Sequence, residues 1–355
     1  MHGDALKTQY ARHVRRKVLA GGGLLLLIVA ASVLSLRTGA YPIRFGELAG
    51  ALVGRADATT VHVLWNMRLP QVVAALLAGA CLGLAGAAMQ TVLRNPLASP
   101  FTLGISQGAV FGAVFAIIVL GVGTTAVTDT DRGVAASPRI IVLCAFAGSL
   151  MTVAALVVLS SLRDLSPAAL ILAGVALSAF FGSATMLLQY FATDIQVASA
   201  VFWTFGDLSK ARWPELGVIA LAMLPAAGYF LCKGWQFNAM VWGDDTARSL
   251  GVGVYALRLV SLVLAALAAS VITAFVGIIG FVGLIAPHIV RMVIGQDHRF
   301  LFPYAALAGG LLLLVSDVLA RTVMAPIVLP VGILTSFAGA PLFLYLLMKH
   351  RDIRS

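Results

Sequence analysis

The sequence predicts an all-α polytopic membrane protein with about ten transmembrane helices, and three observations support this fold class. Of its 355 residues 61% are hydrophobic, and its mean hydropathy is +1.00. Only 11% of the residues are charged, less than half the ~25% of a typical soluble domain, which is too little to form a polar surface. Several apolar segments reach the ~20 residues that a helix needs to cross a bilayer. Together these features exclude a soluble enzyme and a disordered chain.

Ten segments have the length and composition of membrane-spanning helices. The eighth is short and contains glycine and proline, which predicts a broken or tilted helix. We expect one transmembrane domain over residues 18–348, preceded by a cytoplasmic tail (1–17) and followed by another (349–355). The predicted segments are 18–36, 69–93, 103–122, 139–160, 168–191, 214–232, 257–276, 280–295, 302–322 and 332–348.

The distribution of basic residues predicts the orientation. Four of them, Arg12, Arg15, Arg16 and Lys17, precede the first apolar segment, and 15 of all 24 fall on that side of the predicted layout, a modest bias. Because lysine and arginine accumulate in cytoplasmic loops, both termini are expected on the cytoplasmic side. The membrane is expected to be a bacterial cell (inner) membrane. The net charge of +10 is therefore attributed to membrane topology, and nucleic acid is not expected as a partner.

Regularly spaced glycines indicate that some helices approach each other closely. Small residues three or four positions apart allow two helix backbones to come into contact within lipid. Glycine and proline also mark helix breaks, which in a membrane must be buried or line a cavity. The glycines with this spacing are Gly79, Gly83 and Gly86, then Gly104, Gly108 and Gly112, and finally Gly277, Gly280 and Gly283.

The sequence contains no pattern for nucleotide or metal binding, and its one formal catalytic pattern, Gly-x-Ser-x-Gly at 104–108, lies at the start of an apolar helix instead of on the strand–turn–helix that a hydrolase needs. It lacks a Gly-Lys pair and hence a P-loop. Cys81, Cys144 and Cys232 are far apart and lack metal-ligand spacing. We therefore expect no catalytic residue, no metal site and no cofactor in this chain.

Motifs along nearly the whole chain resemble those of the FecCD family, the permease subunits of ABC importers for iron–siderophores, haem and vitamin B12. The most specific are the Arg-Leu-Pro run at 68–70, Arg-Asn-Pro-Leu-Ala-Ser-Pro at 94–100 and Gly-Phe-Val-Gly-Leu-Ile-Ala-Pro-His at 280–288. Further matching runs occur, in the family's order, at 86–90, 103–109, 172–177, 247–251, 316–317, 320–321, 329–332 and 339–341.

The resemblance implies a type II ABC importer permease fold and a homodimer with the pathway on its two-fold axis. It also implies two ATP-binding-cassette subunits that bind ATP and Mg, and a periplasmic or extracellular substrate-binding protein. The expected substrate is a metal chelate, with ferric siderophore favoured and haem or cobalamin as alternatives. An ion-coupled secondary transporter is the alternative from another class, and Asp317 would be its main intramembrane ionisable residue.

A polar loop at 233–256 interrupts the apolar segments on the predicted cytoplasmic side. We expect a short helix in it, with Asp244 or Asp245 as N-cap and Gly251 just beyond its end. The pattern alone fits an ordinary loop equally well, whereas the resemblance implies a coupling helix that fits a groove on the ATPase. The residues concerned are Gly243, Asp244, Asp245, Thr246, Ala247, Arg248, Ser249, Leu250 and Gly251.

Two arginines, Arg68 and Arg321, are expected at the outer face. Snorkelling of their long side chains or an i,i+4 pair between Asp317 and Arg321 would explain them without a partner protein. The resemblance instead implies that they receive acidic residues of the binding protein, because opposite charges steer docking. A third family arginine falls at Gln71, which is neutral and weakens the expected docking charge.

Two turns on the cytoplasmic side are candidates for a gate. Either is also consistent with an ordinary helix–helix turn, and the resemblance implies that the matching segments line a cytoplasmic gate. Pro167 and Ala168 depart from the small hydroxyl residues found there in similar permeases, so the gate's location carries over better than its chemistry. The residues are Asn95, Pro96 and Leu97 in one turn, and Leu165, Ser166, Pro167 and Ala168 in the other.

Three further residues have two interpretations each. Met89 and Gln90 either face the pathway or serve packing and hydrogen bonding between helices. His288 follows a proline in the eighth segment, where a structural role is favoured over metal or haem binding.

Overall fold

A computed structural model describes residues 2–39, 41–122, 138–162 and 166–351, and every one of the ten predicted segments coincides with an α-helix. Seven helices have the length and hydropathy of membrane spans, while α5, α13 and the apolar part of α15 are shorter. No β-strand occurs within the described residues. The ten helices are α1 (His2–Arg37), α4 (Leu69–Val92), α5 (Ile105–Ile118), α6 (Pro138–Leu162), α7 (Pro167–Tyr190), α9 (Trp213–Cys232), α12 (Val254–Val276), α13 (Val282–Ile294), α14 (His298–Thr322) and α15 (Val331–Arg351).

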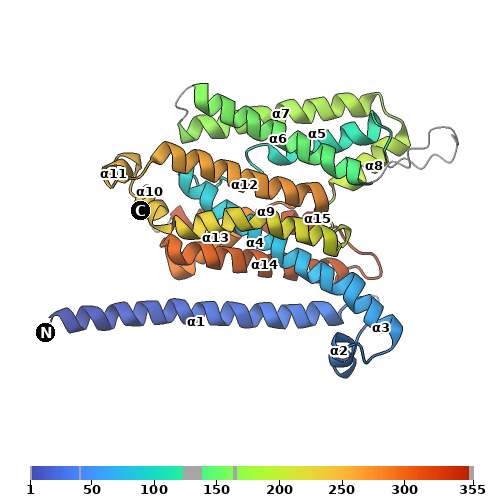
Figure 1. Ribbon diagram of the computed structural model, residues 1–355, viewed down its shortest axis with the longest axis horizontal. Helices are drawn as coiled ribbons and strands as arrows, with labels where there is room; N and C mark the ends of the chain where they lie inside the picture. The colour runs from blue at the N-terminus through green and yellow to red at the C-terminus, as the bar shows by residue number, and fades with distance from the viewer. Residues whose placement is uncertain (1, 40, 123–137, 163–165, 352–355) are drawn as a thin grey trace.

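Shorter helices gather at the two ends of this bundle (Figure 1). At one end lie α2 (Phe45–Leu52), α3 (Ala58–Val63) and α8 (Asp194–Thr204). At the other lie α10 (Gly234–Val241) and α11 (Asp244–Ser249), close to where α1 begins and α15 ends. The π-helix η1 (Leu64–Arg68) leads into α4, and the 3-10 helix η2 (Leu208–Lys210) follows α8. The α10–α11 loop and both ends of the described chain therefore share one end of the bundle.

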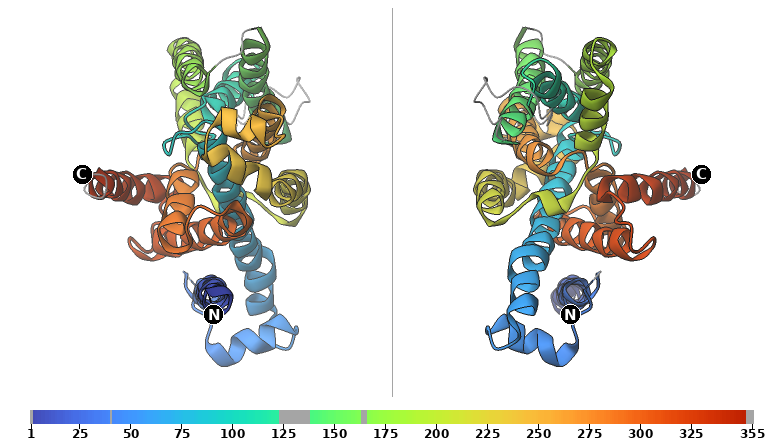
Figure 2. Two further views of the ribbon diagram at one scale, coloured as in Figure 1. Left: turned by 90° about the vertical axis from the view of Figure 1, so that its left-hand side faces the viewer. Right: turned by 90° about the vertical axis from the view of Figure 1, so that its right-hand side faces the viewer.

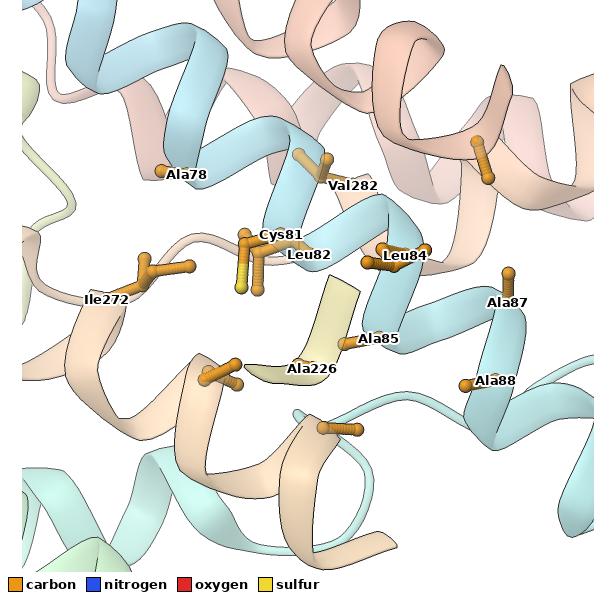
Figure 3. Close-up of a cluster of buried hydrophobic side chains, with 14 of the residues drawn as sticks. Ala78, Cys81, Leu82, Leu84, Ala85, Ala87, Ala88, Ala226, Ile272 and Val282 are labelled. Atoms are coloured by element: carbon orange, nitrogen blue, oxygen red, sulfur yellow. The ribbon is translucent and has the colours of Figure 1, made fainter. Parts of the chain in front are cut away.

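Helix α4 is the centre of the fold. Of its most apolar window 78% is buried, against 11% for α1. It packs against α14, α12, α13 and α9. Figure 3 shows Cys81 and Leu82 of α4 facing Ile272 of α12, with Ala226 of α9 and Val282 of α13 alongside. A helix apolar on all sides is expected in such a buried position.

Glycines bring α4 into backbone contact with its neighbours, as predicted. A Cβ atom on Gly79 would lie 2.2 Å from the carbonyl oxygen of Gly309 in α14. A Cβ on Gly86 would lie 1.9 Å from the carbonyl oxygen of Gly283 in α13. Real Cβ atoms cannot approach so closely, so only glycine fits at these crossings. Gly112 in α5 plays the same part against α6, where its Cβ would lie 1.9 Å from the carbonyl oxygen of Cys144.

The chain leaves the helical conformation between α12 and α13, where the sequence predicted a break. Gly277 ends α12 with φ +81°. Ile278 forms a parallel bridge with Phe205, and its N–H donates to the carbonyl oxygen of Thr204 at 3.3 Å. Hydrocarbon provides no hydrogen-bond partner, so a non-helical segment at membrane depth is stable only when neighbouring chain satisfies it. The short, broken eighth span is thus confirmed as α13.

Helix α1 stands apart from the bundle in the end views of Figure 2 and packs lengthwise only along α14. Contacts near the two ends of its apolar part fix it. At one end the Tyr304 hydroxyl donates to the carbonyl oxygen of Lys17 at 3.0 Å, and the Lys17 ammonium lies 4.5 Å from the Phe300 ring centre. At the other end Arg321 Nη2 donates a hydrogen bond to the Ser35 hydroxyl at 2.6 Å.

The close crossing of α4 and α13 predicts that Gly86→Ala destabilises the protein. The added methyl group would collide with the backbone of Gly283, and overpacking of this kind costs about 1–3 kcal/mol. We expect a lower melting temperature for the detergent-solubilised variant. The control is Gly22→Ala in α1, where nothing lies within 4 Å of the added atom and where alanine favours the helix. Equal melting temperatures for the two variants would contradict the close crossing.

Candidate coupling, docking and gate sites

The polar loop folds as predicted into a short helix, α11, but its N-cap is not an aspartate. Gly243 is the N-cap, with φ +112°, and Asp244 and Asp245 are the first two helical residues. The Asp244 carboxylate is instead bound by Arg258 of α12, whose Nη2 lies 3.1 and 2.9 Å from Oδ1 and Oδ2. The Arg258 guanidinium thus engages this carboxylate, and Asp244 lies in the first turn of the helix instead of at its N-cap position.

Arg258 ties α11 to two other helices. Its Nε donates to the carbonyl oxygen of Val92 at the end of α4, at 2.9 Å. The side chains of Arg258 and Asp244 are 12% and 22% exposed, so water screens this pair less than a surface pair. By contrast Arg248 and Asp245 pair at 62% and 99% exposure, where an ion pair contributes ~0–1 kcal/mol. One strong pair therefore fixes α11 to α12 and α4.

The end of α11 forms the glycine motif that the sequence predicted. The N–H of Val252 donates to the carbonyl oxygen of Ala247 at 3.0 Å, and that of Gly251 to Arg248 at 2.9 Å. With Gly251 at φ +81°, this is a Schellman motif. Ala247 is fully buried, whereas Leu250 is 66% exposed. The helix thus keeps one anchored face and presents another at the end of the bundle.

Arg321, Asp317 and Gln71 form a buried polar cluster between α1, α4 and α14. Arg321 Nη2 lies 2.7 Å from Asp317 Oδ2 and donates to the Ser35 hydroxyl at 2.6 Å. The side chains of Arg321 and Asp317 are 9% and 4% exposed. Gln71 Nε2 donates to the other carboxylate oxygen of Asp317 at 3.0 Å. The i,i+4 pair is confirmed, and Gln71 supplies a bond that the sequence did not indicate.

Arg68, at the α2–α3 end of the bundle, is also buried and only 5% exposed. Its guanidinium donates to the carbonyl oxygens of Leu36 and Tyr41. Carbonyl groups at the end of a helix lack intrahelical partners, and a cation satisfies them well. Arg68 and Arg321 together hold the chain that links α1 to α2.

The first candidate gate turn directly follows α4. Asn95 Oδ1 accepts the N–H of Leu97 at 2.8 Å, which forms an Asx turn. Asn95 and Pro96 line a polar cavity of about 660 Å³ between α4, α10, α13 and the start of α14. Leu97 is 40% exposed.

The second candidate gate turn precedes α7. Ser166 is the N-cap of α7 and accepts the N–H of Ala169 at 3.3 Å. Pro167 is the first residue of the helix, a position where its missing N–H is not needed. Ala168 is exposed, and Leu165 lies outside the described residues. The placement of this turn is thus explained by helix capping.

The alternatives for Met89 and Gln90 are resolved in favour of packing. Met89 is fully buried, and Gln90 is 4% exposed. Gln90 Nε2 donates to the carbonyl oxygen of Gly283 at 3.2 Å, and its Oε1 accepts from Arg291. His288 is 7% exposed, and no group of metal-ligating side chains occurs in the part of the chain that the structure describes.

The model of the FecCD transport family matches residues 25–349. The chain belongs to this family. A Methanocaldococcus jannaschii protein named as an ABC transporter permease, MJ0087, is 50% identical over 96% of the chain and 97% of its own length. The hemin transport system permease protein HmuU of Yersinia pestis is 38% identical, over 83% of the chain and 85% of its own length.

The fold of this FecCD protein agrees with that of a solved relative. The structure of an inward-facing ABC transporter, described as of the metal-chelate type, superimposes with a TM-score of 0.80. It is 32% identical and covers 92% of this chain and 98% of its own. The protein is thus a membrane permease of an ABC importer of metal-chelate type, with the type II fold.

The anchoring of α11 predicts different effects for its two aspartates. Asp244→Asn removes the charge that Arg258 binds and should cost about 1–3 kcal/mol, the range for hydrogen bonds to charged groups. Amide hydrogen exchange should rise at residues 244–252. The matched control is Asp245→Asn, whose exposed pair contributes little. A similar exchange rate in both variants would show that the ion pair does not hold α11.

The buried cluster predicts that Asp317 and Arg321 depend on each other. Asp317→Asn leaves the Arg321 charge buried without a carboxylate, which costs about 3–5 kcal/mol. The double variant Asp317→Asn with Arg321→Gln removes both charges, and it should be more stable than Asp317→Asn alone. The melting temperatures of the single and the double variant in detergent measure the two stabilities. If the double variant is the less stable one, the two residues do not act as a pair.

Proposed function

We propose that this FecCD permease forms, as a homodimer, the pathway of an importer that carries a ferric siderophore. Two ATP-binding-cassette subunits would bind ATP and Mg, and a binding protein would deliver the chelate from outside. The observation that carries the proposal is α11, a short helix fixed at one end of the bundle with an exposed face. Closure of the ATPases would act on this face, and α12 and α4 would receive the motion through Arg258.

Haem is the second candidate substrate, because the relative HmuU is named for hemin transport. Cobalamin remains the third. All three are bulky chelates, and the small side chains of α4 and its neighbours give few charged contacts by which to distinguish them. We favour siderophore because that group is the broadest.

An ion-coupled transporter is less well supported. Its coupling residue would be Asp317, which needs to exchange ions or protons during transport. Asp317 is already bound by Arg321 and Gln71. A carboxylate committed in this way serves the structure rather than an ion pathway.

We propose that the binding protein docks at the α2–α3 end, above Arg68 and Arg321. Because both guanidinium groups are largely buried, their part would be to position the chain between α1 and α2. Arg44, the N-cap of α2, and Arg55, in the turn between α2 and α3, are both exposed, and they would supply charge for steering. In the cell membrane, the α10–α11 end of the bundle and both termini would lie on the cytoplasmic side.

We further propose that Asn95, Pro96 and Leu97 form one side of the cytoplasmic gate and that residues 165–168 form the other. The first turn follows α4 directly, so a movement of α11 would reach it through Arg258 and Val92. Pro167 and Ala168 would contribute apolar side chains where similar permeases have small hydroxyl residues, and the Ser166 hydroxyl would remain engaged in capping α7.

Uptake into proteoliposomes tests the proposal. The permease is reconstituted with its ATPase and binding protein and is offered ferric siderophore, haem and cobalamin in parallel. We expect ATP-dependent uptake of one chelate, with siderophore first. Leu250→Glu should reduce this uptake about tenfold and weaken copurification of the ATPase, because it places a charge at an interface centre.

The control is Leu52→Glu at the α2 end, where the leucine is also exposed (43%, against 66% for Leu250), and it should leave ATPase copurification intact. Transport that continues without ATPase and follows an ion gradient would refute the ABC mechanism. ATP-dependent uptake of haem alone would retain the mechanism and replace the substrate.

A further inference from the structure

The cavity beside the first gate turn has the composition of a ligand site. It measures about 660 Å³, within the ~300–1,000 Å³ of small-molecule sites. It lies between the end of α4, α10, α13 and the start of α14, at the bundle end that carries α11 in Figure 1. Arg94, Asn95, Arg291, Gln296 and His298 are among the residues that line it.

The charge of this lining is positive. No aspartate or glutamate is among the residues that line the cavity. Among the described residues, neither Arg94 nor Arg291 has a carboxylate within 4 Å. Asp297 follows Gln296 in the chain, but it is paired with Arg299 at 2.8 Å. Hydrogen bonds from Arg299, together with one from Asn238, hold the pKa of the Asp297 carboxyl well below its usual range. Its charge is therefore present and already compensated.

Arg291 is held in place for binding by Gln90. Its Nη1 donates to Gln90 Oε1, while Gln90 Nε2 donates back to the α13 backbone at Gly283. The amide thus fixes the orientation of one edge of the guanidinium and leaves other N–H donors for a ligand. A fixed guanidinium with poor access to water is a good partner for carboxylate and phosphate groups.

Helix ends explain only part of this positive charge. α10 and α13 both end at the cavity, and each C-terminus carries about −0.5 of an elementary charge. The end of α4 is already served by Arg258, which bonds the Val92 carbonyl oxygen. Arg94 and Arg291 carry two positive charges, and the C-termini of α10 and α13 together compensate about one of them. About one positive charge therefore has no partner.

We propose that this cavity binds an anion with a phosphate or carboxylate group, held by Arg94 and Arg291. The amides of Asn95 and Gln296 complete the set of donors. The anion is either a free solute or the headgroup of an anionic lipid, and the site does not depend on which chelate is transported. Arg94 also lies against the start of α11, since a Cβ on Gly243 would be 3.7 Å from its Nη2. A bound anion would therefore join the gate turn, α13 and the N-terminus of α11.

Thiol labelling in the permease–ATPase complex tests the site without relying on transport. Cys81, Cys144 and Cys232 are replaced by alanine, and Gln296→Cys places one thiol in the cavity wall. The anionic reagent MTSES and the cationic reagent MTSET are compared in phosphatidylcholine nanodiscs at low ionic strength. The measured quantity is the ratio of the MTSES labelling rate to the MTSET labelling rate. We expect this ratio to be about tenfold higher at Gln296→Cys than at Ala256→Cys, an exposed position at the same end of the bundle.

Two charge variants and two anion sources complete the design. Arg291→Gln, or Arg94→Asn at a φ of +49° that asparagine tolerates, should abolish the preference for MTSES. Slower labelling with millimolar inorganic phosphate supports a free anion. Slower labelling only in nanodiscs with phosphatidylglycerol supports a lipid headgroup. No charge preference, no protection by either source, or no labelling by either reagent would overturn the proposal.

Discussion

The structure depends on backbone contact between helices that glycine alone permits. In lipid the hydrophobic effect does not drive helices together, so close packing of backbones takes its place. α4 meets α14 at Gly79 and Gly309, and it meets α13 at Gly86 and Gly283. These crossings set α4 at the centre, with most of its apolar window buried. The Arg258 cluster and the Asp317 cluster each include a residue of α4.

The position of α4 explains why sites at opposite ends of the molecule belong to one mechanical unit. Arg68 precedes its first residue and binds the α1–α2 connection. At its last turn, the Val92 carbonyl oxygen accepts from Arg258, which also binds Asp244 of α11. A close-packed helix transmits displacement with little deformation. An ATPase acting on α11 would thus move the same helix that anchors the outer connection.

Hydropathy predicted the ten helices well because burial in a membrane imposes one simple requirement on each segment, an apolar run of sufficient length. It predicted the polar contacts less well. The N-cap expected at Asp244 or Asp245 was wrong, since Gly243 takes that position and Arg258, 14 residues from Asp244, binds its carboxylate. The guanidinium of Arg68 binds carbonyl oxygens of residues 36 and 41, a contact that the sequence did not indicate. Such outcomes depend on which segments meet in space, and local sequence patterns do not contain that information.

The cluster around Asp317 shows how the neutral side chain of Gln71 fits among buried charges. Arg321 binds Asp317, while Arg68 is satisfied by backbone carbonyl oxygens. An arginine at position 71 would add a further buried charge to this cluster, which is costly where it lacks a partner. An amide donates the remaining hydrogen bond to Asp317 without adding charge. The Gln71–Asp317 bond thus joins α4 to α14 while the charges of the cluster stay paired.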